Sequence, residues 1–341
     1  MPPTPNRPLQ YLNPGWFSMV MGLCGLALAW NAATPLLGPM AAGVALVMAG
    51  VALVLFVVLA AASLWRWQRH PQALADDLKH PVRHAFVAAV PVSLLLLASV
   101  GQALGLNGRA LELTWLSGCL LQLWATVWVL GRWLAPQASP ATSPWPAITP
   151  ALFIAVVGNV LAPLAGTSLG YGFWASAQLG IGAVFWPVVL ALLLVRRLTH
   201  GPLPDRLLPT WFITIAPPAV IGTVALLHQA PLWVAQACWG VALFAVLWVG
   251  TLGTRLISQP FGMTFWAVSF PLAAFASLTL RLAHATGIAA LQVGGMLALA
   301  LASLVVMGLA LATVRGLRNG SLLAPEPVAS ITPVTGSASR P

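Results

Sequence analysis

The chain has very few charged residues. Only 6% of its 341 residues are Asp, Glu, Lys or Arg, whereas 60% are hydrophobic. A soluble protein carries about 25% charged residues, so this composition excludes a protein that faces water on all sides. We expect an all-α integral membrane protein with one transmembrane domain, residues 15–316. The polar ends, residues 1–14 and 317–341, have the composition of disordered tails.

The sequence is also poor in groups that carry out covalent chemistry. Its three cysteines, Cys24, Cys119 and Cys238, lie inside apolar runs and predict neither a disulfide framework nor a metal site. The stretch GTSLG (166–170) fits the pattern around a hydrolase nucleophile, but it lacks the preceding strand that this motif requires. We therefore expect a protein that is not an enzyme and that uses no catalytic residue, metal or cofactor.

Apolar runs of membrane-spanning length fill most of the chain. A transmembrane helix needs about 20 apolar residues, and the runs between polar, proline or glycine breaks predict ten of them. Because longer and tighter loops alternate between these runs, we interpret the ten spans as five helical hairpins. Their expected limits are 15–34, 38–65, 84–104, 110–134, 147–166, 171–197, 209–228, 231–256, 263–284 and 288–316.

The basic residues lie at the ends of these runs. The formal net charge of +10 could indicate a nucleic-acid partner, but the basic residues do not cluster on one element. If both termini are cytoplasmic, thirteen basic residues fall on that side and only Arg109 and Arg281 on the other. The positive-inside rule therefore predicts cytoplasmic termini in an inner (plasma) membrane, with the lipid bilayer and not nucleic acid as partner.

Acidic residues are absent from the middle of every predicted span. The chain has only five of them. Ion-coupled carriers usually bury carboxylates to relay protons or sodium ions, and rings of carboxylates select cations. Their absence favours passive movement, and the positive net charge favours anions. Coupling through a protonated substrate stays open.

Tryptophan and proline divide the spans into two sets. Eleven of the sixteen tryptophans belong to even-numbered spans or their ends, where they suit lipid-facing positions. Membrane helices tolerate interior prolines where neighbours or water satisfy the freed backbone groups. We predict an inner pore ring of five kinked odd-numbered helices and an outer ring of five even-numbered helices; ordinary kinks in a packed bundle are the alternative. The prolines inside odd-numbered spans are Pro91, Pro163, Pro217, Pro218 and Pro271.

Polar and aromatic residues near these prolines are the candidate site. Pro271 fixes how Phe270 is presented, and a phenyl group at a narrow point can close a passage by steric contact and dewetting; packing in a core is the alternative. Arg109 and Arg281 could serve an outer vestibule or snorkel to the interface. The candidate polar pore-lining residues are Ser93, Asn159, Thr214 and Ser269.

Four stretches carry a family resemblance. They read LNPGWFSMVMGLCGLALAW (Leu12–Trp30), HPVRHAFVAAVPVSLLLLA (His80–Ala98), LPTWFITIAPPAVIG (Leu208–Gly222) and TFWAVSFPLAAFASLTLRLA (Thr264–Ala283). In this order they resemble the tellurite-resistance/dicarboxylate transporter family, which includes the bacterial tellurite-resistance protein and the slow anion channel of plant guard cells. The resemblance extends over roughly residues 12–316.

The resemblance implies a fold and a gate. In that family ten helices form five hairpins, odd-numbered helices line a pore in each subunit, and the subunits form a homotrimer. A phenylalanine of the ninth helix occludes the pore. By its position in the motif SFPLA this residue is Phe270, with Phe265 as the alternative. The two lie about 140° apart around a helix, so they cannot both face the axis.

Two transport functions follow. We expect a passive channel for small anions such as chloride or nitrate, because no arginine sits in the middle of a span to clamp a dicarboxylate. The alternative is a proton-linked carrier or exporter of C4-dicarboxylates or of oxyanions such as tellurite or sulfite. A non-conducting membrane receptor or assembly subunit is a third class that the sequence leaves open.

Overall fold

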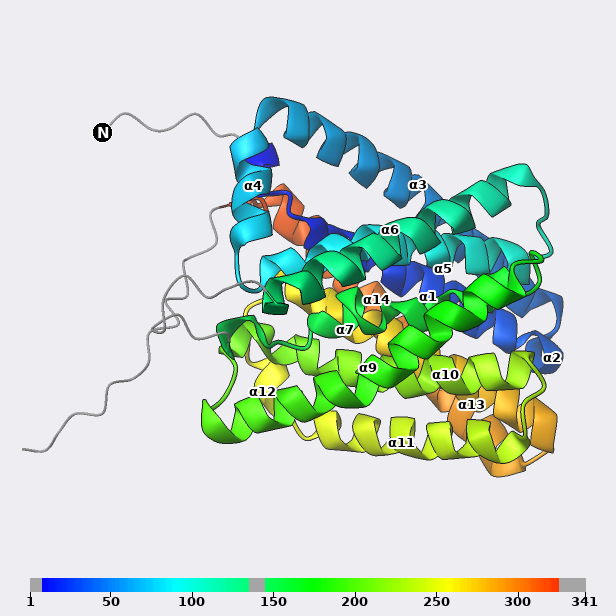
Figure 1. The fold of residues 1–341 in the computed structure, drawn as a ribbon. Coiled ribbons are helices and arrows are strands. Elements are labelled where there is room, and N and C mark those ends of the chain that lie inside the picture. Colours follow the sequence, from blue (N-terminus) through cyan, green and yellow to red (C-terminus); the bar gives the residue numbers. More distant parts are fainter. Residues whose placement is uncertain (1–7, 135–144, 325–341) are drawn as a thin grey trace, which may run out of the picture.

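The computed structural model describes residues 8–134 and 145–324 of the chain. Within these two ranges all regular elements are helices, which confirms the all-α class. The helices lie side by side, with α4 (Pro71–Lys79) and α12 (Gly253–Ile257) at one end of the bundle and α2 (Thr34–Leu37) at the other (Figure 1).

Nine of the described helical segments are long and apolar enough to cross a membrane. The even-numbered spans are α3 (Pro39–Arg69), α6 (Arg109–Leu134), α9 (Gly172–Thr199), α11 (Leu232–Gly250) and α14 (Ala289–Arg318). The odd-numbered spans contain α1 (Ser18–Ala32), α5 (Ala89–Ala103), α10 (Ala216–Leu227) and α13 (Ser269–Thr286). The remaining predicted span, 147–166, is broken into α7 (Leu152–Ala155), the 3-10 segment η5 (Val157–Leu161) and α8 (Pro163–Gly166).

Each odd-numbered span contains a 3-10 segment that leads into an α-helix. In addition to η5, these segments are η2 (Pro14–Phe17), η3 (Arg83–Ala88), η6 (Asp205–Ile215) and η7 (Met263–Val268). A 3-10 helix advances about 120° per residue and an α-helix about 100°. The change of pitch therefore rotates the faces of these spans relative to a uniform α-helix.

The prolines lie at these changes of pitch, which corrects our expectation of prolines inside α-helices. Pro163 is the first residue of α8, and Pro217 and Pro218 are the second and third residues of α10. Pro91 and Pro271 are the third residues of α5 and α13. Proline is tolerated in the first turn of an α-helix, where an amide has no partner four residues earlier.

Odd-numbered and even-numbered spans differ in burial. In the most apolar stretches of the four continuous odd-numbered spans, 78–83% of residues are buried, against 17–39% in the even-numbered spans. Neighbouring spans pack as pairs, α1 with α3, α5 with α6, α10 with α11 and α13 with α14. Figure 1 shows α6 and α9 crossing the front of the bundle. The arrangement in two concentric rings stays a prediction. It requires buried odd-numbered spans and exposed even-numbered spans, as these fractions show.

Side chains of α6 satisfy the backbone of the broken fifth span. The Gln122 amide donates to the carbonyl oxygens of Ile154 and Ala155, both at 3.0 Å. The indole Nε1 of Trp115 donates to the carbonyl oxygen of Ala162 at 2.9 Å. A bilayer offers no water to carbonyls that a broken helix leaves free, so this span depends on α6 for its hydrogen bonds.

The predicted tails are partly structured. Residues 8–14 of the expected disordered tail 1–14 include the 3-10 turn η1 (Pro8–Tyr11), and Leu12 is buried. The carbonyl oxygen of Gln10 accepts a hydrogen bond from the Arg66 guanidinium at 2.9 Å. A fixed backbone contact therefore holds this part of the segment that the composition assigned to a disordered tail. The first seven residues lie outside the described part of the chain.

The expected C-terminal tail, 317–341, also begins within a helix, because α14 continues to Arg318. Residues 325–341 lie outside the described residues.

We predict that Gln122→Leu destabilises the protein. Leucine cannot donate to the buried carbonyls of the fifth span, and an unsatisfied buried acceptor costs about 1–3 kcal/mol. Thermal unfolding of the purified protein in detergent measures this loss. The control is Gln292→Leu, at a half-buried position in the first turn of α14, for which we expect a change within about 0.5 kcal/mol. Equal effects of the two substitutions would contradict the assignment.

Candidate functional site

Two cavities follow one another along the odd-numbered spans. Cavity A has a volume of about 250 Å³ and lies toward the C-terminal ends of α1, α5 and α10 and along α13 from Phe270 to Arg281. Cavity B has a volume of about 40 Å³ and lies near the 3-10 segments of the same spans. Each cavity is lined by residues from all five odd-numbered spans, and in the described ranges no even-numbered span contributes to either.

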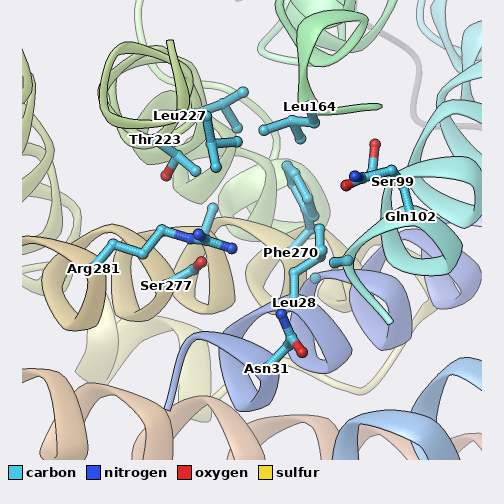
Figure 2. A pocket seen from close by; sticks show the side chains of 14 residues that line it. Leu28, Asn31, Ser99, Gln102, Leu164, Thr223, Leu227, Phe270, Ser277 and Arg281 are labelled. Atoms are coloured by element: carbon cyan, nitrogen blue, oxygen red, sulfur yellow. The ribbon is translucent and has the colours of Figure 1, made fainter. Parts of the chain in front are cut away.

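Phe270 lies where the two cavities meet. Of the described residues, only Phe270 and Val220 line both A and B. Figure 2 shows the Phe270 side chain projecting from α13 into cavity A, toward Leu164 of the broken fifth span. Phe270 is 8% exposed. Phe270 therefore lies, with Val220, at the boundary between the cavities in this structure.

Gly25 lets α1 approach this phenyl group. A Cβ atom at Gly25 would lie 2.8 Å from Cδ2 of Phe270 and 3.3 Å from Cβ of Ala273. Such a contact is too close for a real side chain, so glycine is needed for α1 and α13 to enclose Phe270 at this distance. This contact could not be predicted from the sequence, because Gly25 lies in an apolar run that does not show which residue packs against it.

Phe265, the alternative to Phe270, lies elsewhere. It belongs to the 3-10 segment η7 and is half-buried. The centre of its phenyl ring lies 5.7 Å from that of Phe261. It is not among the described residues that line cavity A or B. The position of Phe270 thus fits the gate that the sequence predicts, and the position of Phe265 does not.

The two cavities differ in polarity. The described side chains that line cavity B are all apolar, apart from one glycine. At about 40 Å³ it has room for only a few water molecules, so it is a small hydrophobic neck, a kind of space that resists wetting. Cavity A has a mixed lining whose polar members are Asn31, Ser99, Gln102, Thr223, Ser277 and Arg281.

The polar residues that the sequence predicted for the pore do not line either cavity, among the residues described. All four are buried and hydrogen-bonded inside the protein: Ser93, Asn159, Thr214 and Ser269. The three hydroxyl groups donate to backbone carbonyls three or four residues earlier, and the Asn159 amide donates to Oγ1 of Thr126 at 2.7 Å.

The lining hydroxyls lie further along the same spans, at Ser99, Thr223 and Ser277. Ser99 lies on the same span as Ser93, Thr223 on that of Thr214 and Ser277 on that of Ser269. Because the pitch changes at each 3-10 segment, a constant α-helical period cannot show which hydroxyl faces the axis.

The predicted kinks also contribute little to the cavity walls. Of the five prolines, Pro217 lines cavity B, and Pro91, Pro163, Pro218 and Pro271 are not among the described lining residues. The prolines mark the changes of pitch, and the residues that follow them form the walls. This corrects the prediction that the prolines themselves line the pore.

The structure separates the two candidate vestibule arginines. Arg109 is the first residue of α6, is exposed, and is not among the described lining residues of either cavity. Arg281 lines cavity A, and its Nε is buried without a hydrogen-bond partner among the described residues. The sequence alone could not distinguish these two arginines, because a position near the end of a span is also typical of a snorkelling side chain.

Comparison with known proteins identifies the family. The sequence profile described as "Voltage-dependent anion channel" matches residues 11–314. The chain belongs to the voltage-dependent anion channel family. This confirms the resemblance inferred from four apolar stretches. Together with its apolar helices, membership makes the chain a multi-pass membrane protein of a family of anion channels and transporters, not of enzymes.

Relatives in this family come from archaea, plants and bacteria. An uncharacterized transporter of Methanocaldococcus jannaschii is 26% identical over 289 residues, which cover 77% of this chain and 81% of the relative. The tellurite resistance protein TehA homolog of Haemophilus influenzae is 24% identical over 79% of this chain and 81% of its own length. The S-type anion channel SLAH2 of Arabidopsis thaliana is 24% identical over 64% of this chain and 42% of the plant protein.

The difference between the cavities predicts a difference in chemical access. In a protein whose native cysteines (Cys24, Cys119 and Cys238) are replaced by alanine, Ser277→Cys in cavity A should react with a charged methanethiosulfonate reagent in detergent. Val157→Cys in cavity B should react about tenfold more slowly or less, because the reagent must pass an apolar neck. Mass spectrometry of the modified protein measures both rates. Equal rates would show that the two cavities are equally wet.

Proposed function

We propose that this protein is a passive anion channel that conducts small anions, such as chloride and nitrate, along the axis of its odd-numbered spans. The supporting observation is that cavity A and cavity B lie one after the other between the same five spans and meet at Phe270. An anion would enter cavity A, pass the phenyl group and cross cavity B.

In the proposed closed state, Phe270 and the hydrophobic neck act together. An anion that enters cavity B must leave most of its hydration shell, because a space of about 40 Å³ lined by apolar groups offers no replacement ligands. Desolvation of an ion without a partner costs several kcal/mol even after the protein relaxes. Displacement of the phenyl group would join the two spaces and admit water with the ion.

The charges along the route favour anions. Arg281 is the charged residue in cavity A, and the described linings of both cavities contain no Asp or Glu. A cation would meet a positive charge at the wide end of the route and no counter-charge further on. The name of the plant relative, an S-type anion channel, points the same way.

The proposed transport is passive because the route lacks proton-carrying side chains. Neither cavity has Asp, Glu or His among its described lining residues. A proton-linked carrier of C4-dicarboxylates or of oxyanions would therefore have to carry the proton on the substrate itself. This alternative is favoured by one observation, the name of the tellurite-resistance relative.

We also propose a homotrimer in the inner membrane, with both termini cytoplasmic and a separate pathway in each subunit. Both cavities are lined within one chain, so a pathway does not require a neighbouring subunit. The outward faces of α3, α11 and α14 carry many exposed large apolar side chains, which suit contact with lipid or another subunit. The excess of basic residues at one set of helix ends supports the orientation.

We predict that Phe270→Ala raises the resting chloride and nitrate conductance of the reconstituted protein by about tenfold or more, which corresponds to a barrier lower by at least about 1.4 kcal/mol. The physical reason is that alanine leaves space between cavities A and B. Planar-bilayer recording measures the current. Phe265→Ala is the matched control, because it removes the same side chain outside the cavities, and its current should equal that of the wild type.

Two results would contradict this proposal. A large current from Phe265→Ala and none from Phe270→Ala would move the gate to the other phenylalanine. Strict dependence of anion uptake into liposomes on a proton gradient would favour the carrier.

A further inference from the structure

Arg281 makes no hydrogen bond or ion pair with any other residue in the described part of the chain, although its Nε is buried. We propose that cavity A is an anion-binding site, in which the Arg281 guanidinium binds an anion with two or more oxygen acceptors, such as nitrate or a small carboxylate, next to the closed gate. The inference rests on the proposed anion pathway and adds to it a binding residue and a preference for oxygen anions.

Cavity A also contains side-chain donors that are free. Figure 2 shows Arg281 reaching from α13 into the cavity, with Ser277 on the same helix and Asn31 at the end of α1. The side chains of Ser277, Asn31 and Gln102 have no hydrogen-bond partner in the two described ranges, so all three can donate to a ligand.

The other two hydroxyl groups of cavity A are already committed. Ser99 donates to the carbonyl oxygen of Leu95 at 2.7 Å, and Thr223 donates to that of Ala219 at 2.9 Å. Their protons are therefore not available to an anion in this structure. Discrimination between ligands thus falls to Arg281 and the three free donors, which lie on α1, α5 and α13.

An anion in cavity A needs the positive charge of Arg281, because the backbone around the cavity is partly negative. Cavity A lies toward the C-terminal ends of α1, α5 and α10, where the helix dipoles leave partial negative charge. The described lining contains no carboxylate that could pair with Arg281. One guanidinium therefore supplies the positive charge of a site that would otherwise repel anions, and it is itself left without a counter-charge until an anion binds.

The geometry of guanidinium gives the site a preference. Its planar N–H groups form two parallel hydrogen bonds to a pair of oxygen atoms, as in nitrate or a carboxylate. A chloride ion has no such pair of acceptors. It is attracted by the positive charge but cannot accept the two parallel hydrogen bonds. A lysine would keep the charge and lose this preference.

Binding can be measured without transport. Sodium nitrate, sodium formate or sodium chloride is titrated into the full-length protein in detergent, in Tris–HEPES buffer, and the unfolding temperature is followed by tryptophan fluorescence, because a ligand of the folded state raises it. We expect a saturable rise for the wild type. Arg281→Gln should weaken the nitrate affinity about tenfold or more, and Arg281→Lys should lose the preference for nitrate over chloride.

The control is Arg109→Gln, which removes the same charge from an exposed position that does not line a cavity. It should bind nitrate as the wild type does. Without added anions, Arg281→Gln should unfold at the same temperature as the wild type or higher, because it removes an unpaired charge, and this shows that the variant is folded. An unchanged nitrate affinity in Arg281→Gln, or no saturable rise in the wild type, would overturn the proposal.

Currents distinguish this proposal from the proposed function. If Phe270→Ala conducts, the double variant Phe270→Ala/Arg281→Gln should lose the preference for nitrate over chloride that Phe270→Ala shows. An unchanged preference in the double variant would overturn the binding site and leave the channel intact. A Phe270→Ala protein that binds nitrate through Arg281 but passes no current would overturn the channel and leave the site.

Discussion

The structure depends on one constraint: in a bilayer, every backbone polar group needs a partner inside the protein. The odd-numbered spans break the regular α-helical pattern, because each contains a 3-10 segment, and the fifth is divided into three short pieces. Carbonyl groups that are left free where the pitch changes need partners from the protein when they lie in a bilayer. The hydrogen bonds from Gln122 and Trp115 to the carbonyls of the fifth span illustrate how a continuous helix supplies the missing partners. Burial of the odd-numbered spans and exposure of the even-numbered ones follow from the same requirement.

Spans that change pitch do not fill the space between them as uniform helices do. The two cavities occupy that space: the apolar neck lies across the change of pitch, and the polar cavity lies further along the α-helices. Phe270, in the first turn of α13 next to the junction, lies between them, and Gly25 allows α1 to close against it. In this account the gate, the neck and the arginine of cavity A are consequences of how five irregular segments meet.

Much of this architecture could be predicted from the sequence. Hydropathy shows where the spans lie, because about 20 apolar residues leave few alternatives, and the motif SFPLA singles out Phe270. The faces of the spans could not be predicted in the same way. Ser93 and Thr214 lie on the expected spans, but the unknown lengths of the 3-10 segments set which residues face the axis, and Thr223 and Ser277 do so. The role of Arg281 was equally hidden, because its free guanidinium becomes apparent only when its neighbours are known. The ordered segment around Gln10 depends on a contact with Arg66, 56 residues away in sequence.

The central claim is that an axial route exists between the odd-numbered spans and is interrupted at Phe270. The most direct test is an electron cryo-microscopy structure of Phe270→Gly in lipid nanodiscs. The account predicts that the five spans keep their positions and that cavities A and B merge into one continuous passage with ordered water or anion density. A structure in which neighbouring side chains collapse into the vacated space, and the two cavities stay separate while the variant conducts, would contradict it.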